Sequence, residues 1–126
     1  MKQLVLVFLG GGIGSALRYA IGKFFNTSTA GFPWSTFTVN IIGSLLIGLF
    51  IGIALKSSSF SENQTLLLVT GFCGGFTTFS AFTYENQQFL KAGDLTNFAI
   101  YTLGSIGLGI IAVLLGFVMS KSFSTL

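Results

Sequence analysis

Four long apolar stretches constrain this chain more than any other feature of its sequence. They cover residues 4–22, 35–55, 65–84 and 97–120. A helix needs about 20 mostly apolar residues to cross the hydrocarbon core of a bilayer, so each stretch is long enough to form a transmembrane helix. The connections between the stretches are too short to hold a further domain. We therefore predict an all-α integral membrane protein with a single four-helix domain over residues 1–126.

The charge content agrees with this fold class. Only 7% of the residues are charged, whereas a soluble domain has about a quarter. The chain has no histidine, one cysteine (Cys73) and three acidic residues, too few for a His/Cys metal site, a catalytic triad or a disulfide. We therefore do not expect an enzyme. A scattered net charge of +3 does not predict a nucleic-acid partner, which leaves the lipid bilayer of the inner or plasma membrane.

Turn-forming residues separate the four stretches. They lie in residues 26–31 with Pro33, in residues 57–63 and in residues 91–94. We expect the first stretch to be a retained span and not a cleaved signal peptide, because Arg18 and three further apolar stretches follow it.

The loop charges do not choose an orientation in the membrane. With four spans, both termini and the second loop share one side, and the positive residues divide evenly between the two sides. Either details elsewhere decide a weak bias, or copies insert both ways and pair as an antiparallel, dual-topology homodimer. The positive residues are Lys2, Lys56 and Lys121 on one side, and Arg18, Lys23 and Lys91 on the other.

Small and polar residues recur about every four positions on the second and fourth stretches. Such stripes are typical of helix–helix packing faces. Because they also carry hydroxyl groups, the alternative is that they line a permeation route. The stripes are Thr36, Asn40, Ser44, Gly48 and Gly52, and Tyr101, Ser105, Gly109, Ala112 and Gly116.

Two polar side chains lie where the membrane makes them costly. Asn40 is near the start of the apolar centre, so its amide either bonds to a neighbouring helix or donates an N–H to a pore. We expect Arg18 on the last turn of the first helix, without an acid four residues away. It either snorkels toward the headgroups or, as we favour, supplies positive potential at the wall of a vestibule.

The third stretch contains the densest pattern, over residues 71–83. The pair Gly74-Gly75, followed closely by Thr77-Thr78, is poor material for a continuous helix, so we predict a broken third helix. Unwound backbone at membrane depth is tolerated only where it is buried in protein or lines a cavity, where its carbonyls could bind a cation. The alternative is a kinked or tightly packed helix.

Phenylalanines at helical spacing run through the same stretch. A packing or lipid-facing stripe is the simpler interpretation. The alternative is that the ring edges, which carry positive partial charge, face a small anion and hold it loosely enough to let it leave. The rings are Phe72, Phe76, Phe79 and Phe82, and further donors would be Ser80, Thr83 and the amide of Asn40.

Together, residues 11–19, 33–44 and 71–80 resemble the small fluoride-channel family known as CrcB or Fluc. The resemblance implies passive fluoride export from the cytoplasm through a dual-topology dimer with two antiparallel pores. Some members pair as two different chains, so a heterodimer with a related chain is a second possibility.

The resemblance also implies a role for individual residues. Phe79 and Phe82 match two pore phenylalanines, Asn40 a pore amide and Arg18 a vestibule arginine, while Tyr101 and Ser105 match a polar track. Backbone carbonyls that match Gly74 and Thr77, from both subunits, hold a structural sodium ion that is not transported. Ala81 and Gly109 depart from the family pattern, and each puts one side-chain contact in doubt.

Two other functions compete with this interpretation. A small multidrug exporter also has four short helices, but it needs a carboxylate within the membrane, and we expect Glu62 and Asp94 in loops and Glu85 after the third span. A non-transporting structural subunit would explain the small-residue stripes, but not a break followed by hydroxyls and phenylalanines.

Overall fold

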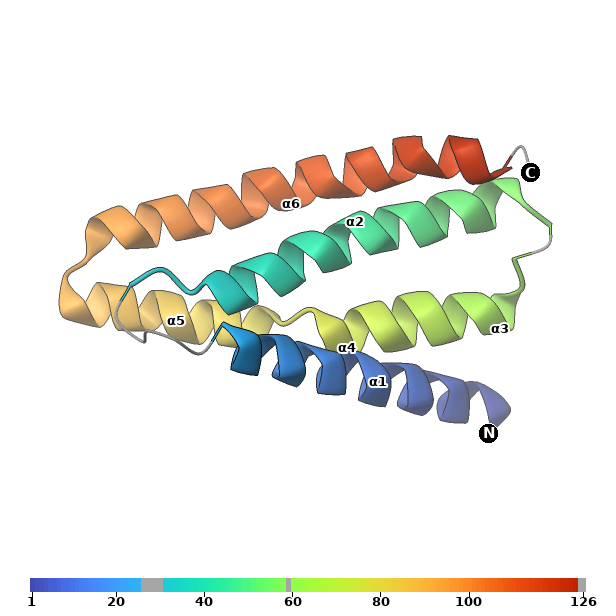
Figure 1. The fold of residues 1–126 in the computed structure, drawn as a ribbon, viewed down its shortest axis with the longest axis horizontal. Helices are drawn as coiled ribbons and strands as arrows, with labels where there is room; N and C mark the ends of the chain where they lie inside the picture. Colours follow the sequence, from blue (N-terminus) through green and yellow to red (C-terminus); the bar gives the residue numbers. More distant parts are fainter. Residues whose placement is uncertain (26–30, 59, 125–126) are drawn as a thin grey trace.

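Four long helical segments lie side by side in the computed structural model, which describes residues 1–25, 31–58 and 60–124 (Figure 1). The first is α1 (Lys2–Phe24), the second is α2 (Trp34–Lys56), and the last is α6 (Leu95–Ser124). By length and composition, these three and the composite third segment are each able to cross a membrane. The all-α, four-span prediction is therefore confirmed.

The third segment consists of several helical pieces. It begins with α3 (Glu62–Thr65), continues through the π-helix η1 (Leu66–Cys73) into α4 (Gly74–Phe76), and resumes after an interruption as α5 (Phe79–Ala92). The sequence did not predict the π-helical stretch, a geometry that is often found near functional sites.

The predicted break is confirmed, and it falls on the two threonines. Thr77 (φ −85°, ψ 159°) and Thr78 (φ −150°, ψ 116°) have extended backbone. Gly74, by contrast, is helical at φ −63° and ψ −37°. The glycine pair therefore does not interrupt the helix. The low helix propensity of the glycines and threonines indicated the right region for the break, but not the residues at which it occurs.

Two expectations about helix ends are wrong. Because α1 continues to Phe24, Arg18 lies inside the helix and not on its last turn. Likewise α5 continues to Ala92 and ends where Gly93 adopts a left-handed φ of 72°, so Glu85 lies within the third segment and not after it. The apolar stretch ends before the helix does. The helix continues because its backbone hydrogen bonds persist through the amphipathic stretch that follows.

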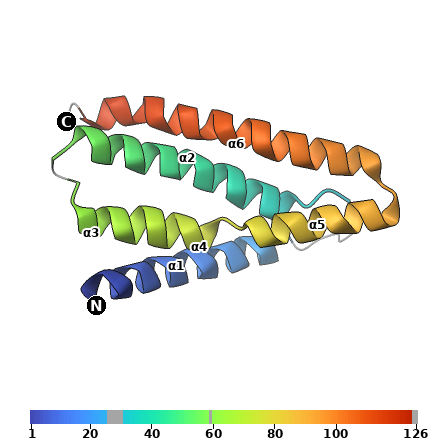
Figure 2. The same ribbon diagram turned by 180° about the vertical axis from the view of Figure 1, so that it is seen from behind.

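Glycines set the close contacts between helices. A Cβ on Gly48 of α2 would overlap the backbone of Val113, and one on Gly116 of α6 would overlap that of Leu45. The small-residue stripes of α2 and α6 therefore do form a packing face. On the other side of the molecule, α1 contacts η1 and α4, so the third segment lies between α1 and α2 (Figures 1 and 2).

The start of α1, the end of α6 and the α2–α3 connection lie at one end of the molecule, and the α5–α6 turn lies at the other (Figure 2). The second connection is shorter than predicted, because Ser61 and Gln64 form a capping box that starts α3 at Glu62. Most of the first predicted turn, residues 26–30, lies outside the described residues.

Candidate functional site

The side chain of Asn40 on α2 holds the break in the third segment. Its Nδ2 donates to the Thr78 carbonyl at 3.1 Å, and the Thr78 amide donates to its Oδ1 at 2.8 Å. The amide oxygen thus replaces the helical acceptor that the Thr78 N–H loses, and the amide nitrogen adds a donor to the carbonyl of Thr78, the N-cap of α5. An amide nitrogen carries two N–H bonds, so one N–H remains for another acceptor.

The break releases several backbone carbonyls from the helical ladder, those of Gly74 and Thr77 among them. In a continuous α-helix the amide of Thr78 would bond to Gly74 O, and the amide of Ala81 to Thr77 O. Here Thr78 donates to Asn40, and Ala81 donates to the Thr78 hydroxyl at 3.2 Å. Gly74 is also exposed, and a Cβ built on it would meet no atom within 4 Å. Both carbonyls fit the hard oxygen ligands that an alkali or alkaline-earth cation prefers.

A cavity of 480 Å³ opens beside the break, between α2, the third segment and α6. It brings together many of the residues that the sequence singled out, and its lining includes no charged side chain. The lining residues are Asn40, Gly43, Ser44, Ile47, Val69, Thr70, Cys73, Gly74, Thr77, Thr78, Phe79, Phe82, Ser105 and Ile106.

The phenylalanine stripe divides into two pairs at the break. Phe72 and Phe76 stack in parallel with ring centroids 5.5 Å apart, and Phe76 is buried, as packing residues are. Phe79 and Phe82 lie on the cavity with centroids 5.8 Å apart and a tilt of 41°. Phe82 is only 8% exposed whereas Phe79 is 76% exposed, so the Phe79 ring is accessible from outside the chain.

Ser105 on α6 lines the same cavity and has a hydroxyl without a partner. Its Oγ is buried and makes no hydrogen bond within the part of the chain that the structure describes. A buried hydroxyl left in this state costs about 1–3 kcal/mol, so a ligand or water that bonded to it would relieve that cost. The cavity therefore offers an amide, a hydroxyl and two rings.

A second cavity, of 390 Å³, lies on the α1 side of the break. Thr78 lines both cavities, so the extended backbone separates them. Arg18 and Lys23 line this one, and the role of Arg18 at a vestibule stays a prediction. The other lining residues are Tyr19, Gly22, Ser35, Thr36, Val39, Thr78 and Ala81.

Comparison with known proteins identifies relatives of this chain. The family model described as "CrcB-like protein, Camphor Resistance (CrcB)" matches residues 5–117. The chain belongs to the CrcB family.

Three similar proteins are each named a fluoride-specific ion channel, FluC. The Phocaeicola vulgatus protein is 49% identical over 123 residues, which cover 96% of this chain and 100% of the relative. The Gloeothece citriformis protein is 46% identical, with 96% and 98% covered, and the Azobacteroides pseudotrichonymphae protein is 41% identical, with 98% and 99% covered. These names do not favour the exporter or the structural subunit.

A partly buried polar network in this CrcB-family chain was missed in the sequence. Glu85 accepts hydrogen bonds from Thr36 Oγ1 at 2.9 Å and from Tyr101 OH at 3.0 Å, so its carboxylate joins α5 to α2 and α6. Tyr101 therefore points to Glu85 within the chain. A polar residue on the packing stripe of α2, opposite a polar residue on α6, was the available signal, but the predicted end of the third span concealed it.

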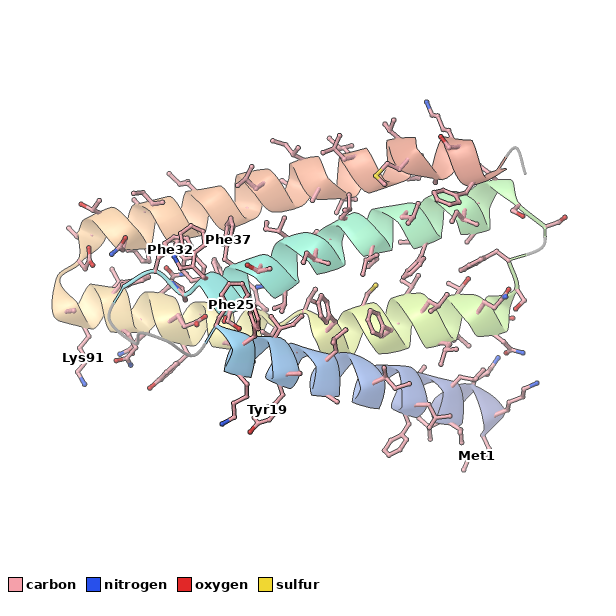
Figure 3. The ribbon with its side chains drawn as sticks, in the orientation of Figure 1. Met1, Tyr19, Phe25, Phe32, Phe37 and Lys91 are labelled. Carbon is pink, nitrogen blue, oxygen red and sulfur yellow. The ribbon has the colours of Figure 1, made fainter. Side chains whose placement is uncertain are left out.

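Aromatic rings surround this network. Tyr101 contacts Phe82 at 5.0 Å and Phe32 at 5.2 Å between centroids, and Phe32 contacts Phe37 at 5.5 Å. Figure 3 shows Phe32 and Phe37 close together at the start of α2. Tyr101 is fully buried as a result, and its ring supports the Phe82 side of the cavity.

Ser80 and Thr83 lie on the first turns of α5 but line neither cavity. Both residues are exposed; the Thr83 hydroxyl donates to the Ser80 carbonyl at 3.0 Å, and the Ser80 and Thr78 hydroxyls are 3.3 Å apart. Their predicted contribution to anion binding stays a prediction.

Proposed function

We propose that this multi-pass membrane protein is a fluoride-specific ion channel that lowers cytoplasmic fluoride by passive efflux. The observation that carries the proposal is the cavity at the broken helix, in a chain whose relatives are named fluoride-specific channels along nearly their whole length. Passive transport requires no bond to be made or broken, so no catalytic residue is assigned.

The chemistry of the larger cavity suits a small, strongly hydrogen-bonding anion. The Asn40 amide and the Ser105 hydroxyl are donors, and the ring edges of Phe79 and Phe82 add weak positive potential. Because the lining holds no fixed cation, an anion is attracted without being trapped, which is the condition for conduction. Ser80, Thr83 and Tyr101 are assigned to the polar surroundings of this pathway.

The functional unit is an antiparallel homodimer in this proposal. The cavity is open, the Phe79 ring is mostly exposed, and apolar side chains cover the outer face of α6, so one copy leaves the pathway incomplete. A second copy of opposite orientation would close it by two-fold symmetry. A related chain of the same family is the alternative partner.

A structural sodium ion completes the proposed dimer. The Gly74 and Thr77 carbonyls have lost their helical partners, and two copies would supply four such oxygens around one ion. The ion would replace the hydrogen-bond donors that the partially negative carbonyl oxygens have lost. The chain itself keeps the oxygens in place, through the bonds of Thr78 to Asn40.

Fluoride efflux from liposomes tests the channel. Purified protein is reconstituted in vesicles loaded with potassium fluoride or potassium chloride, a potassium ionophore is added, and an electrode records the external anion. We expect rapid release of fluoride and no release of chloride. If protein that elutes as a folded, monodisperse species releases fluoride no faster than protein-free vesicles, the proposal is wrong.

A further inference from the structure

The carbonyl of Gly75, just before the break, accepts hydrogen bonds from two side chains of α1. Ser15 Oγ donates to it at 3.3 Å and Arg18 Nε at 3.0 Å, and both interactions are partly buried. Carbonyls in the last turn of a helix have no intrahelical donor, and in the membrane an unpaired one costs free energy. These two side chains satisfy the carbonyl from another helix.

The backbone contact between the two helices makes this arrangement possible. Gly11, Ser15 and Arg18 are spaced to lie on one face of α1. A Cβ on Gly75 would overlap the carbonyl oxygen of Gly11, so the absence of a side chain lets α4 approach α1. The close approach brings the Gly75 carbonyl within reach of Ser15, one turn further along α1, and of the longer Arg18.

The break is therefore held from two sides. On one side Asn40 of α2 binds the backbone of Thr78, and on the other Ser15 and Arg18 of α1 bind Gly75. The first attachment is on extended Thr78, which leads directly into Phe79, and the second is on Gly75, two residues before extended Thr77. A shift of Gly75 would displace the rings and the amide that line the larger cavity.

We propose that Ser15 and Arg18 form a clamp on the Gly75 carbonyl, and that Arg18 acts on permeation as a positioning residue through its Nε–H and not through its charge. The proposal rests on the proposed fluoride flux. It differs from the vestibule interpretation, in which the positive charge of Arg18 attracts anions and the identity of the donor atom is unimportant.

Three substitutions of Arg18 separate the donor from the charge. In Arg18→Gln, the amide nitrogen lies the same number of bonds from Cα as Nε does in arginine, so the donor stays and the charge is lost. Arg18→Lys keeps the charge but places a methylene at that position, and Arg18→Met places a methyl there and removes both properties. All three side chains have a similar length.

We expect Arg18→Gln to keep fluoride efflux within about threefold of the wild type, and Arg18→Lys and Arg18→Met to lose about tenfold or more, because the Gly75 carbonyl then keeps only the longer bond from Ser15. Wild-type efflux measured in parallel tests the channel function itself. If Arg18→Lys keeps the flux while Arg18→Gln loses it, the charge is what matters and the clamp is wrong. Full flux in Arg18→Met overturns it as well.

Hydrogen–deuterium exchange provides a readout that does not depend on fluoride transport. In the detergent-solubilised protein, we expect amides of residues 74–80 to exchange faster in Arg18→Met and Arg18→Lys, and at the wild-type rate in Arg18→Gln. Lys23→Gln, which removes a charge from the same cavity without touching Gly75, should leave this exchange unchanged. Should Arg18→Met fail to fold, Ser15→Ala removes the longer bond and should raise exchange in the same segment. Equal exchange in all folded variants overturns the clamp.

Discussion

The side-chain amide of Asn40 and the backbone of Thr78 hydrogen-bond in both directions, at 3.1 and 2.8 Å. Extended backbone is costly at membrane depth unless its polar groups find partners, and Asn40, 38 residues earlier in the chain, supplies the acceptor for the Thr78 N–H and a donor to its carbonyl. The break in the third segment therefore depends on α2 as much as on its own residues.

Asn40→Asp should abolish most fluoride flux. The change keeps the shape and the oxygen that accepts from the Thr78 amide, but it removes the N–H that donates to the Thr78 carbonyl and can place a negative charge on the cavity wall. We expect efflux from liposomes to fall by at least about tenfold. Asn63→Asp on α3, which lines neither cavity, is the matched control and should keep wild-type flux. Unchanged flux in Asn40→Asp would remove the amide from the pathway.

The two phenylalanines on the cavity should respond differently to isoleucine. Phe79→Ile and Phe82→Ile both remove a ring edge, so each should lower fluoride efflux sharply. Only Phe82→Ile should also lower the unfolding temperature in detergent, because Phe82 is 8% exposed and Phe79 is 76% exposed. Phe8→Ile, at a ring on α1 that is also 76% exposed, controls for loss of an exposed ring. If both cavity variants conduct like the wild type, the rings serve packing only.

Tyr101→Phe should destabilise the fold with little change in shape. The substitution keeps the ring against Phe82 and removes the hydroxyl that donates to Glu85 at 3.0 Å. A hydrogen bond of this kind within a membrane protein contributes about 1 kcal/mol, and Thr36 alone would then hold the carboxylate. Equilibrium unfolding in detergent measures the change. Tyr84→Phe, at an exposed ring, should match the wild type, and an equally stable Tyr101→Phe would show that the network contributes nothing.

The sequence predicts the features that depend on residues close together in the chain, and it misses those that depend on contacts between helices. The four spans and the break follow from local hydropathy and from poor helix formers near Gly74 and Thr78, and the structure has both. The location of the break at the threonines depends on Asn40, and the contact of Arg18 with Gly75 depends on how α1 packs on α4. Neither contact between helices is visible in the pattern of a single span.

The same limit explains the error at Glu85. The third apolar stretch ends at residue 84, so Glu85 was expected after the third span, and an unpaired carboxylate within a span is costly. Partners on α2 and α6 reduce that cost and let the helix continue past it. A charged residue at the predicted end of a span therefore marks the end of the helix only if the neighbouring helices offer it no polar partner.

Dual topology predicts that each end of the molecule is found on both sides of the membrane. Ser58→Cys in the α2–α3 connection and Ala92→Cys at the end of α5 mark opposite ends without altering the positive residues, which balance three against three. In a Cys73→Ser background, a membrane-impermeant maleimide applied to intact cells should label about half of each variant, because insertion is unbiased. Permeabilised cells, in which every engineered cysteine is accessible, provide the total. Full labelling of one variant and none of the other would establish a single orientation, and an antiparallel pair of identical chains would then be impossible.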